Sequence, residues 1–213
     1  MRIILVRHGE SEWNRLGIYQ GQEDAPLSEL GLRQADALAN RLQHETIDTI
    51  YTSPLQRARK TAEAIARFHP HVPFVQDEAL MEIHHGVWQG LLATEVRERY
   101  PEMLEEWRRF PTRCQMPGGE SFSNILKRTL NFRERVCDVP ADGTILFSTH
   151  DVVIKILIAD VLGMPMDRIN HIWVTNASIS VVEYTENSPF LVSLSEACHL
   201  GQLESVREKQ LAV

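Results

Sequence analysis

The sequence is poor in cysteine, has no long hydrophobic run and carries no excess of positive charge. Its three cysteines, Cys114, Cys137 and Cys198, are widely spaced and form no CxxC pair, so we expect neither a disulfide framework nor a zinc site. Such thiols fit a reducing compartment, which predicts a cytoplasmic protein. No apolar stretch approaches the roughly 18 residues of a membrane-spanning helix, so we expect no membrane partner.

The charge balance is acidic, with 22 Lys and Arg against 29 Asp and Glu and a net charge of -7. A field of this sign disfavours nucleic acid as a partner. Any anionic ligand must therefore be held by a local basic cluster. With 213 residues, no internal repeat and no linker, the chain is long enough to bury its own core, and we expect a single domain over 1–213.

Short apolar runs with β-branched residues alternate with helical patterns. Buried strands are predicted at 2–7, 47–52 and 144–149, and two more β-rich runs lie at 178–184 and 190–194. Helices are predicted at 28–43, 53–68, 94–110, 121–137 and 151–162. Ser53 is the expected cap of the second helix and Asp151 that of the last. The alternation predicts an α/β fold, a three-layer α/β/α sandwich with a mostly parallel sheet.

Basic side chains follow three of the predicted strands. Arg7 and His8 come at the end of the first, Arg57 lies one turn after the second, and His150 follows the third. Ligands of open α/β sheets bind beyond the carboxyl ends of the strands, where guanidinium groups and helix N-termini suit an oxyanion. Each residue alone could be a surface charge. Their equivalent positions favour a phosphate site.

Five motifs resemble the histidine phosphatase superfamily, the phosphoglycerate mutase-like proteins. They are "LVRHGESEWN" (5–14), "SPLQRARKTA" (53–62), "MEIHHGVWQG" (81–90), "MPGGES" (116–121) and "STH" (148–150). The resemblance extends to about residue 200. It implies a phosphoglycerate mutase-like fold with a helical cap insertion at about 90–135 and a C-terminal tail at about 200–213.

The same resemblance implies that His8 is the nucleophile and becomes phosphohistidine, with no metal and no other cofactor. Arg7, Arg57 and His150 would hold the phosphoryl oxygens. This chemistry is physically reasonable because arginines and a protonated His150 can stabilise charge on the equatorial oxygens. His8 must be neutral to attack, so we expect a backbone carbonyl to hold its other ring nitrogen.

Glu82 is implied as the proton donor and Asn14 as a residue at the pocket edge. Glu82 can donate only if burial and a dianionic substrate raise its pKa. Without the resemblance, an exposed glutamate before a turn would be an equal alternative.

The form "EIHHGVWQG" (82–90) looks like the phosphatase branches of the family. Mutases carry a longer insertion between the acid and the late histidine, and the separation of 68 positions here (150 minus 82) leaves no obvious room for it. Hydrolysis is therefore favoured over isomerisation.

The tail "EACHLGQLE" (196–204) is similar to metal-independent phosphoserine phosphatases. That branch implies His85 and His199 near the amino-acid end of the substrate, although His85 could instead merely stabilise a turn.

Asp151 departs from the family, which usually has glycine after the late histidine. Its carboxylate either caps the following helix or contacts a substrate ammonium.

The expected activity is a phosphomonoesterase for a small phosphorylated metabolite, L-phosphoserine first. The alternatives are a broad-specificity sugar or organic-acid phosphatase, a phosphoglycerate mutase, and a non-catalytic phospho-ligand binder. A β-rich C-terminal sheet edge could also pair two copies as a homodimer.

Overall fold

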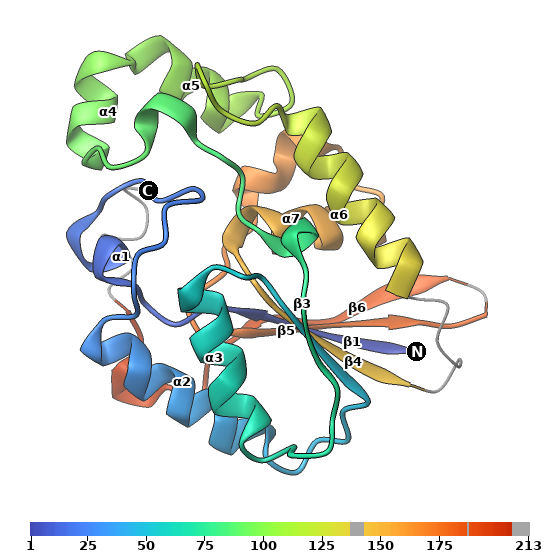
Figure 1. The fold of residues 1–213 in the computed structure, drawn as a ribbon. Coiled ribbons are helices and arrows are strands. Elements are labelled where there is room, and N and C mark those ends of the chain that lie inside the picture. Colours follow the sequence, from blue (N-terminus) through green and yellow to red (C-terminus); the bar gives the residue numbers. More distant parts are fainter. Residues whose placement is uncertain (137–142, 187, 206–213) are drawn as a thin grey trace.

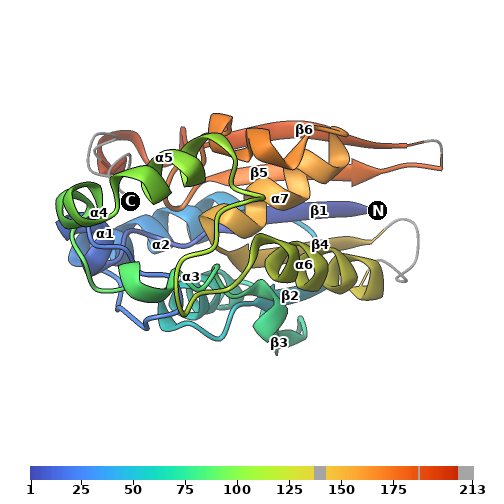
Figure 2. The ribbon, with the colours of Figure 1, turned by 90° about the horizontal axis from the view of Figure 1, so that it is seen from above.

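The computed structural model describes residues 1–136, 143–186 and 188–205. Within these ranges the chain builds one six-stranded sheet in the order β3-β2-β4-β1-β5-β6 (Figures 1 and 2). The strands are β1 Arg2–Arg7, β2 Thr49–Thr52, β3 Phe74–Gln76, β4 Thr144–Thr149, β5 Ile179–Tyr184 and β6 Pro189–Glu196. The pairs from β3 to β1 are parallel, whereas β5 is antiparallel to both β1 and β6. The predicted mostly parallel sheet therefore ends in an antiparallel extension.

Helices cover both faces of this sheet. α2 and α3 lie on one face, and α6 and α7 lie on the other (Figure 1). The helices are α1 Glu12–Leu16, α2 Glu29–Leu42, α3 Gln56–Ala66, α4 Ala93–Arg99, α5 Pro101–Arg109, α6 Phe122–Val136 and α7 Asp151–Val161. The predicted three-layer α/β/α sandwich is confirmed.

The alternation of side chains along β1 explains its central position. Ile3 and Leu5 join the hydrophobic cluster under α6 and α7, whereas Ile4 and Val6 join the cluster under α2 and α3. All four are at most 2% exposed. Burying one aliphatic side chain of this size stabilises the fold by about 1.5–3 kcal/mol, so β1 is anchored from both faces. The packing on both faces therefore also holds in place the carboxyl end of β1, which leads into Arg7 and His8.

Two helix predictions were wrong at their boundaries. The expected helix at 94–110 is two helices, α4 and α5, because Pro101 disfavours helical backbone at Tyr100 and then occupies the first position of α5. α3 begins at Gln56 with Leu55 in the capping position, not at Ser53. Asp24 Oδ1 instead accepts from the Gln56 N–H at 2.6 Å, so a distant loop supplies the cap.

The remaining differences are small. The second strand begins at Thr49 instead of residue 47, and the short strand β3 had no clear signal in the sequence. Residue 137, the predicted end of α6, lies outside the described residues, as does the predicted tail from 206 onward. Among the residues that the structure describes, no helix has the length and apolar character needed to cross a membrane.

Candidate active site

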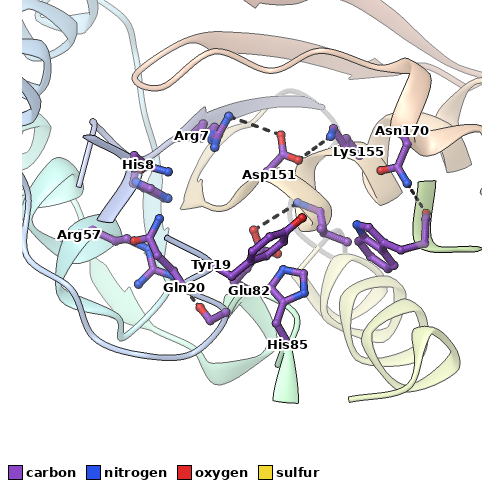
Figure 3. A pocket seen from close by; sticks show the side chains of 14 residues that line it. Arg7, His8, Tyr19, Gln20, Arg57, Glu82, His85, Asp151, Lys155 and Asn170 are labelled. Atoms are coloured by element: carbon purple, nitrogen blue, oxygen red, sulfur yellow. Dashed lines mark hydrogen bonds and ion pairs between the residues drawn. The ribbon is translucent and has the colours of Figure 1, made fainter. Parts of the chain in front are cut away.

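A cavity of about 90 Å³ lies at the carboxyl end of the parallel strands (Figure 3). Its wall includes Arg7, His8, Arg57, Glu82 and Asp151, which come from four separate segments of the chain. The strand ends therefore bring together most of the side chains that the sequence singled out.

His8 is the buried imidazole of this cavity. Its Nδ1 lies 2.7 Å from the carbonyl oxygen of Gly9, and because a carbonyl can only accept, Nδ1 carries the proton. Nε2 is therefore the nitrogen with a free lone pair. Burial first, and then the charges of Arg57 and Arg7, hold the pKa of His8 well below its usual range. The ring is neutral near pH 7, which is the form that can act as a nucleophile.

The backbone around His8 is held from three directions. The His8 N–H donates to the Thr149 carbonyl at 3.0 Å, and Asn176 Nδ2 donates to the His8 carbonyl at 3.0 Å. The Gly9 N–H donates to Thr61 Oγ1 at 3.1 Å. Because these partners come from β4, α3 and the segment before β5, the imidazole has little freedom to move.

Arg7 and Arg57 supply the positive charge. Arg57 is 1% exposed, and its guanidinium donates to the carbonyls of Gly21 at 2.7 Å and Glu23 at 2.8 Å. Burial lowers the pKa of Arg57 to about 10, so it remains charged at neutral pH. The Nε groups of both arginines are buried and have no hydrogen-bond partner among the described residues. An anion in the cavity would satisfy such donors.

His150 is not among the residues of the cavity wall, but its ring packs against that of His8. The two ring centroids are 5.1 Å apart, and His150 is fully buried. Its Nε2 lies 2.9 Å from Ser53 Oγ, and its Nδ1 has no partner in the described part of the chain. Burial and the Arg57 charge hold the pKa of His150 well below its usual range in the free site. Its protonation during phosphoryl transfer stays a prediction.

Glu82 is a buried carboxyl group at the N-terminus of α7. Its Oε1 accepts from the Ile83 N–H at 2.9 Å and its Oε2 from the Val152 N–H at 3.4 Å. Burial, and then the charge of Asp151, raise its pKa. A carboxyl group with a raised pKa is a better proton donor to a leaving alkoxide than an ordinary glutamate. Arg128 Nη2 donates to the Glu82 carbonyl at 3.0 Å, which fixes the backbone behind this group.

Asp151 does not cap α7, so the capping expectation was wrong. His150 occupies the capping position, and Asp151 is the first helical residue. Its Oδ2 lies 2.5 Å from Lys155 Nζ, one turn along the helix, and its Oδ1 lies 3.6 Å from Arg7 Nη1 (Figure 3). Two cations of the chain thus already neutralise this carboxylate, which weighs against a substrate ammonium at the same place.

Asn14 and His85 line the cavity as expected. Asn14 Oδ1 accepts from the Ser11 N–H at 3.1 Å, which closes the first turn of α1. His85 packs between the rings of Tyr19, Trp88 and Trp107. Burial lowers the pKa of His85 to about 4. The imidazole is therefore neutral near pH 7, and its position near the amino-acid end of the substrate stays a prediction.

His199 is not among the residues of the cavity wall, so its expected position near the amino-acid end of the substrate stays a prediction. Its Nε2 lies 3.0 Å from the Ala177 carbonyl. Ala177 in turn donates its N–H to the carbonyls of Arg7 and His8, both at 3.1 Å. His199 thus supports the backbone behind the site.

Among the wall residues that sequence reasoning missed are those with polar or aromatic side chains: Tyr19, Gln20, Trp107, Lys155 and Asn170. Lys155 had a usable signal, since it is the basic residue of an otherwise apolar helix and follows Asp151 by four positions. The others reach the cavity from loops, α5 and a 3-10 turn, whose positions depend on tertiary packing.

These side chains define a class of protein. The site combines a neutral imidazole that has a free Nε2 with two guanidinium groups and a buried carboxyl group. This combination suits the binding of a tetrahedral oxyanion and phosphoryl transfer to nitrogen. Within the described ranges, no group of three or more His, Cys, Asp and Glu residues has the arrangement of a metal site.

Comparison with known proteins identifies the family. Residues 3–197 match the model of the histidine phosphatase superfamily (branch 1), and the chain belongs to this superfamily. It is 37% identical over 202 residues, 95% of both chains, to phosphoserine phosphatase 1 of Hydrogenobacter thermophilus. It is 34% identical over 197 residues, 91% of this chain and 89% of the relative, to a probable phosphoglycerate mutase GpmB of Photorhabdus laumondii. The solved structure of YhfR from Bacillus stearothermophilus superposes with a TM-score of 0.88 at 31% identity, covering 93% of this chain and 98% of that one. The protein is a phosphatase, a phosphoric monoester hydrolase.

Proposed function

We propose that the protein hydrolyses small phosphomonoesters in two steps through phosphohistidine at His8, with L-phosphoserine as its substrate. The observation that carries the proposal is the hydrogen bond from His8 Nδ1 to the Gly9 carbonyl. It leaves Nε2 available in a cavity that Arg7 and Arg57 also line. The relation to a phosphoserine phosphatase supports the choice of substrate.

In the first step, His8 Nε2 attacks phosphorus while the bond from phosphorus to the leaving oxygen breaks. Arg7 and Arg57 stabilise the charge on the equatorial oxygens, and a bound dianion raises the pKa of His150 so that its Nδ1–H can contribute. Glu82 gives its proton to the leaving alkoxide. Asn14 contacts the phosphoryl group at the pocket edge. No step requires a metal, because the arginines supply the positive charge.

In the second step, water attacks the phosphohistidine. Glu82, now ionised, takes a proton from this water, and inorganic phosphate leaves while His8 returns to its neutral form. A mutase would instead pass the phosphoryl group to a second hydroxyl group, and a non-catalytic binder would retain the ester unchanged.

One incubation separates these three functions. The protein is mixed with L-phosphoserine, 3-phosphoglycerate and a chromogenic phosphate ester in the presence of a chelator, and free phosphate and isomerised product are measured. We expect free phosphate, no isomer, and an acid-labile phosphoryl adduct on His8. His8→Ala removes the activity, whereas His44→Ala, at an exposed histidine, keeps it. Loss of phosphate release in chelator, or an adduct on another residue, would refute the mechanism.

The cellular location and the oligomeric state are also proposals. Cys114 and Cys198 are free thiols, which supports a reducing cytoplasm. β6 is an edge strand that exposes Phe190, Val192 and Leu194, which supports the predicted homodimer through this edge. Sedimentation of the purified protein tests the dimer, and a monomer at micromolar concentration would contradict it.

A further inference from the structure

A second cavity of about 170 Å³ adjoins the first on the side away from His8. The two share several wall residues, among them Arg7, Asp151 and Lys155. The second cavity adds Arg108 and the indole of Trp173. A phosphoryl group held by Arg7 and Arg57 in the first cavity would therefore direct the rest of the substrate into the second.

Lys155 occupies an unusual position between the two cavities. It lies in α7, where seven of the eleven residues are buried hydrophobic side chains, and its own side chain is 12% exposed. Asp151 binds the ammonium group at 2.5 Å, but an ammonium group has three donors. Figure 3 shows Lys155 beside Asp151 on the cavity wall. A second anion can therefore approach Lys155 without displacing Asp151.

The charges of the combined wall do not balance with a phosphoryl group alone. In the acid form of Glu82, which the proposed first step uses, Asp151 is the remaining carboxylate of the described wall residues, and the wall then has an excess of three positive charges. A phosphomonoester dianion accounts for two of them and leaves one. The four basic residues are Arg7, Arg57, Arg108 and Lys155.

We propose that Lys155 binds a carboxylate on the leaving group, so that the second cavity selects phosphomonoesters of hydroxycarboxylic acids. L-phosphoserine carries this carboxylate. Its ammonium group offsets the charge of the carboxylate, so its recognition rests on the local contact with Lys155 and not on the net charge of the ester. Arg108, an exposed residue of the second cavity's wall, adds to the attraction. The proposal rests on the phosphatase activity proposed above and names the group that the enzyme recognises beyond the phosphate.

Matched substrates test the proposal on the unmodified enzyme. O-phosphoethanolamine is L-phosphoserine without its carboxylate, and glycerol 3-phosphate is 3-phosphoglycerate with an alcohol in its place. We expect kcat/KM to fall by roughly 10- to 100-fold when the carboxylate is absent, as for the loss of a hydrogen bond to a charged group. Equal values within each pair would overturn the proposal.

Substitution of Lys155 assigns the effect to this residue. In Lys155→Met, kcat/KM for L-phosphoserine should fall by roughly the same factor, while that for O-phosphoethanolamine should change by no more than about threefold. Lys155→Arg keeps the preference, and Lys127→Met, at an exposed lysine of α6, leaves it unchanged. An equal loss with both substrates would show that Lys155 only supports Asp151 and would refute the proposal.

Two further measurements keep the test decisive. If Lys155→Met fails to fold, the double variant Asp151→Asn/Lys155→Met removes both charges and leaves no carboxylate without its lysine partner, and the same loss of preference is expected. The chromogenic ester monitors the chemistry at His8 independently. Hydrolysis of that ester without any preference for a carboxylate refutes only this proposal, whereas no hydrolysis of any ester refutes the proposed function.

Discussion

Ser53 Oγ lies 2.9 Å from Nε2 of His150, and this hydrogen bond joins the segments that follow β2 and β4. The Ser53 N–H also donates to the Ser148 carbonyl at 3.0 Å, so backbone and side chain of one serine fix the approach of the two strand ends. Because His150 packs against His8, Ser53 acts as a positioning residue for the pair of imidazoles.

Ser53→Ala should therefore lower kcat by roughly tenfold, the effect of one lost buried hydrogen bond, with little change in KM. Steady-state kinetics with L-phosphoserine measures the two constants separately. The exposed Ser123 of α6 provides the control, because Ser123→Ala touches neither histidine. A kcat within twofold of the wild type would contradict a positioning role for Ser53.

Glu82→Gln tests the proton donor through the leaving group. Alkoxides need a proton to leave, whereas nitrophenolate leaves without one, so the variant should lose about 10²- to 10⁴-fold in kcat on L-phosphoserine and far less on p-nitrophenyl phosphate. The ratio of the two rates is the measurement. Glu78→Gln, at an exposed glutamate, should leave the ratio unchanged. Equal losses on both esters would exclude Glu82 as the acid.

Asp151→Asn should shift the pH profile. The charge of Asp151 helps to raise the pKa of Glu82, and the acid form of Glu82 is the active one in the first step. Activity is therefore lost as the pH rises through this pKa, and removing the charge should move the loss to lower pH. The profile of kcat/KM measures the shift. Because Lys155 and Arg7 already pair with Asp151, the ratio of phosphoserine to phosphoglycolate hydrolysis should remain the same. A changed ratio would instead support contact with the substrate ammonium.

The central strands and the residues at their ends could be predicted because the information is local. An apolar run such as 2–7 has few alternatives to a buried strand, and the rule that ligands bind at the carboxyl ends of parallel strands then places His8 and Arg57 together. The sequence motifs alone were therefore enough to predict that His8 and Arg57 lie in one site.

The features that the sequence did not predict depend on contacts between distant segments. Asp24 caps α3 from more than 30 positions away, so no local pattern could show that Ser53 is free to hold His150. Similarly, the neutral state of His85 arises from burial among aromatic rings of three different segments. Its charge could not be deduced from the "HHG" turn.

Gly31→Ala should destabilise the loop that carries His8. A Cβ at Gly31 would lie 1.9 Å from the Glu10 carbonyl oxygen, and a Cβ at Gly9 would lie 2.6 Å from the Gly31 carbonyl oxygen. The two backbones must separate, at a cost of about 1–3 kcal/mol in the free energy of unfolding, and the nucleophile moves with them. Denaturant unfolding and kcat measure the two effects. Arg33→Ala, at an exposed position of α2, should change neither. Wild-type activity in Gly31→Ala would show that the loop does not need this close contact.

The buried histidines should make the fold sensitive to acid. Burial lowers the pKa of His85 to about 4, whereas the unfolded chain titrates near 6.5. Protonation therefore favours the unfolded state. The contribution of His85 is fully present above pH 6.5 and is lost as the pH falls, by about 2 kcal/mol at pH 5 and about 3 kcal/mol at pH 4. His8 and His150, whose pKa values are also lowered by burial, act in the same direction.

Urea unfolding of the wild type and of His85→Phe between pH 7 and pH 4 isolates the effect, because the aromatic replacement keeps the packing and removes one titrating group. The variant should show a slope smaller by about one proton, while His44→Gln, at an exposed histidine, should keep the wild-type slope. An unchanged slope in His85→Phe would mean that this imidazole is protonated as easily in the folded protein as in the unfolded chain.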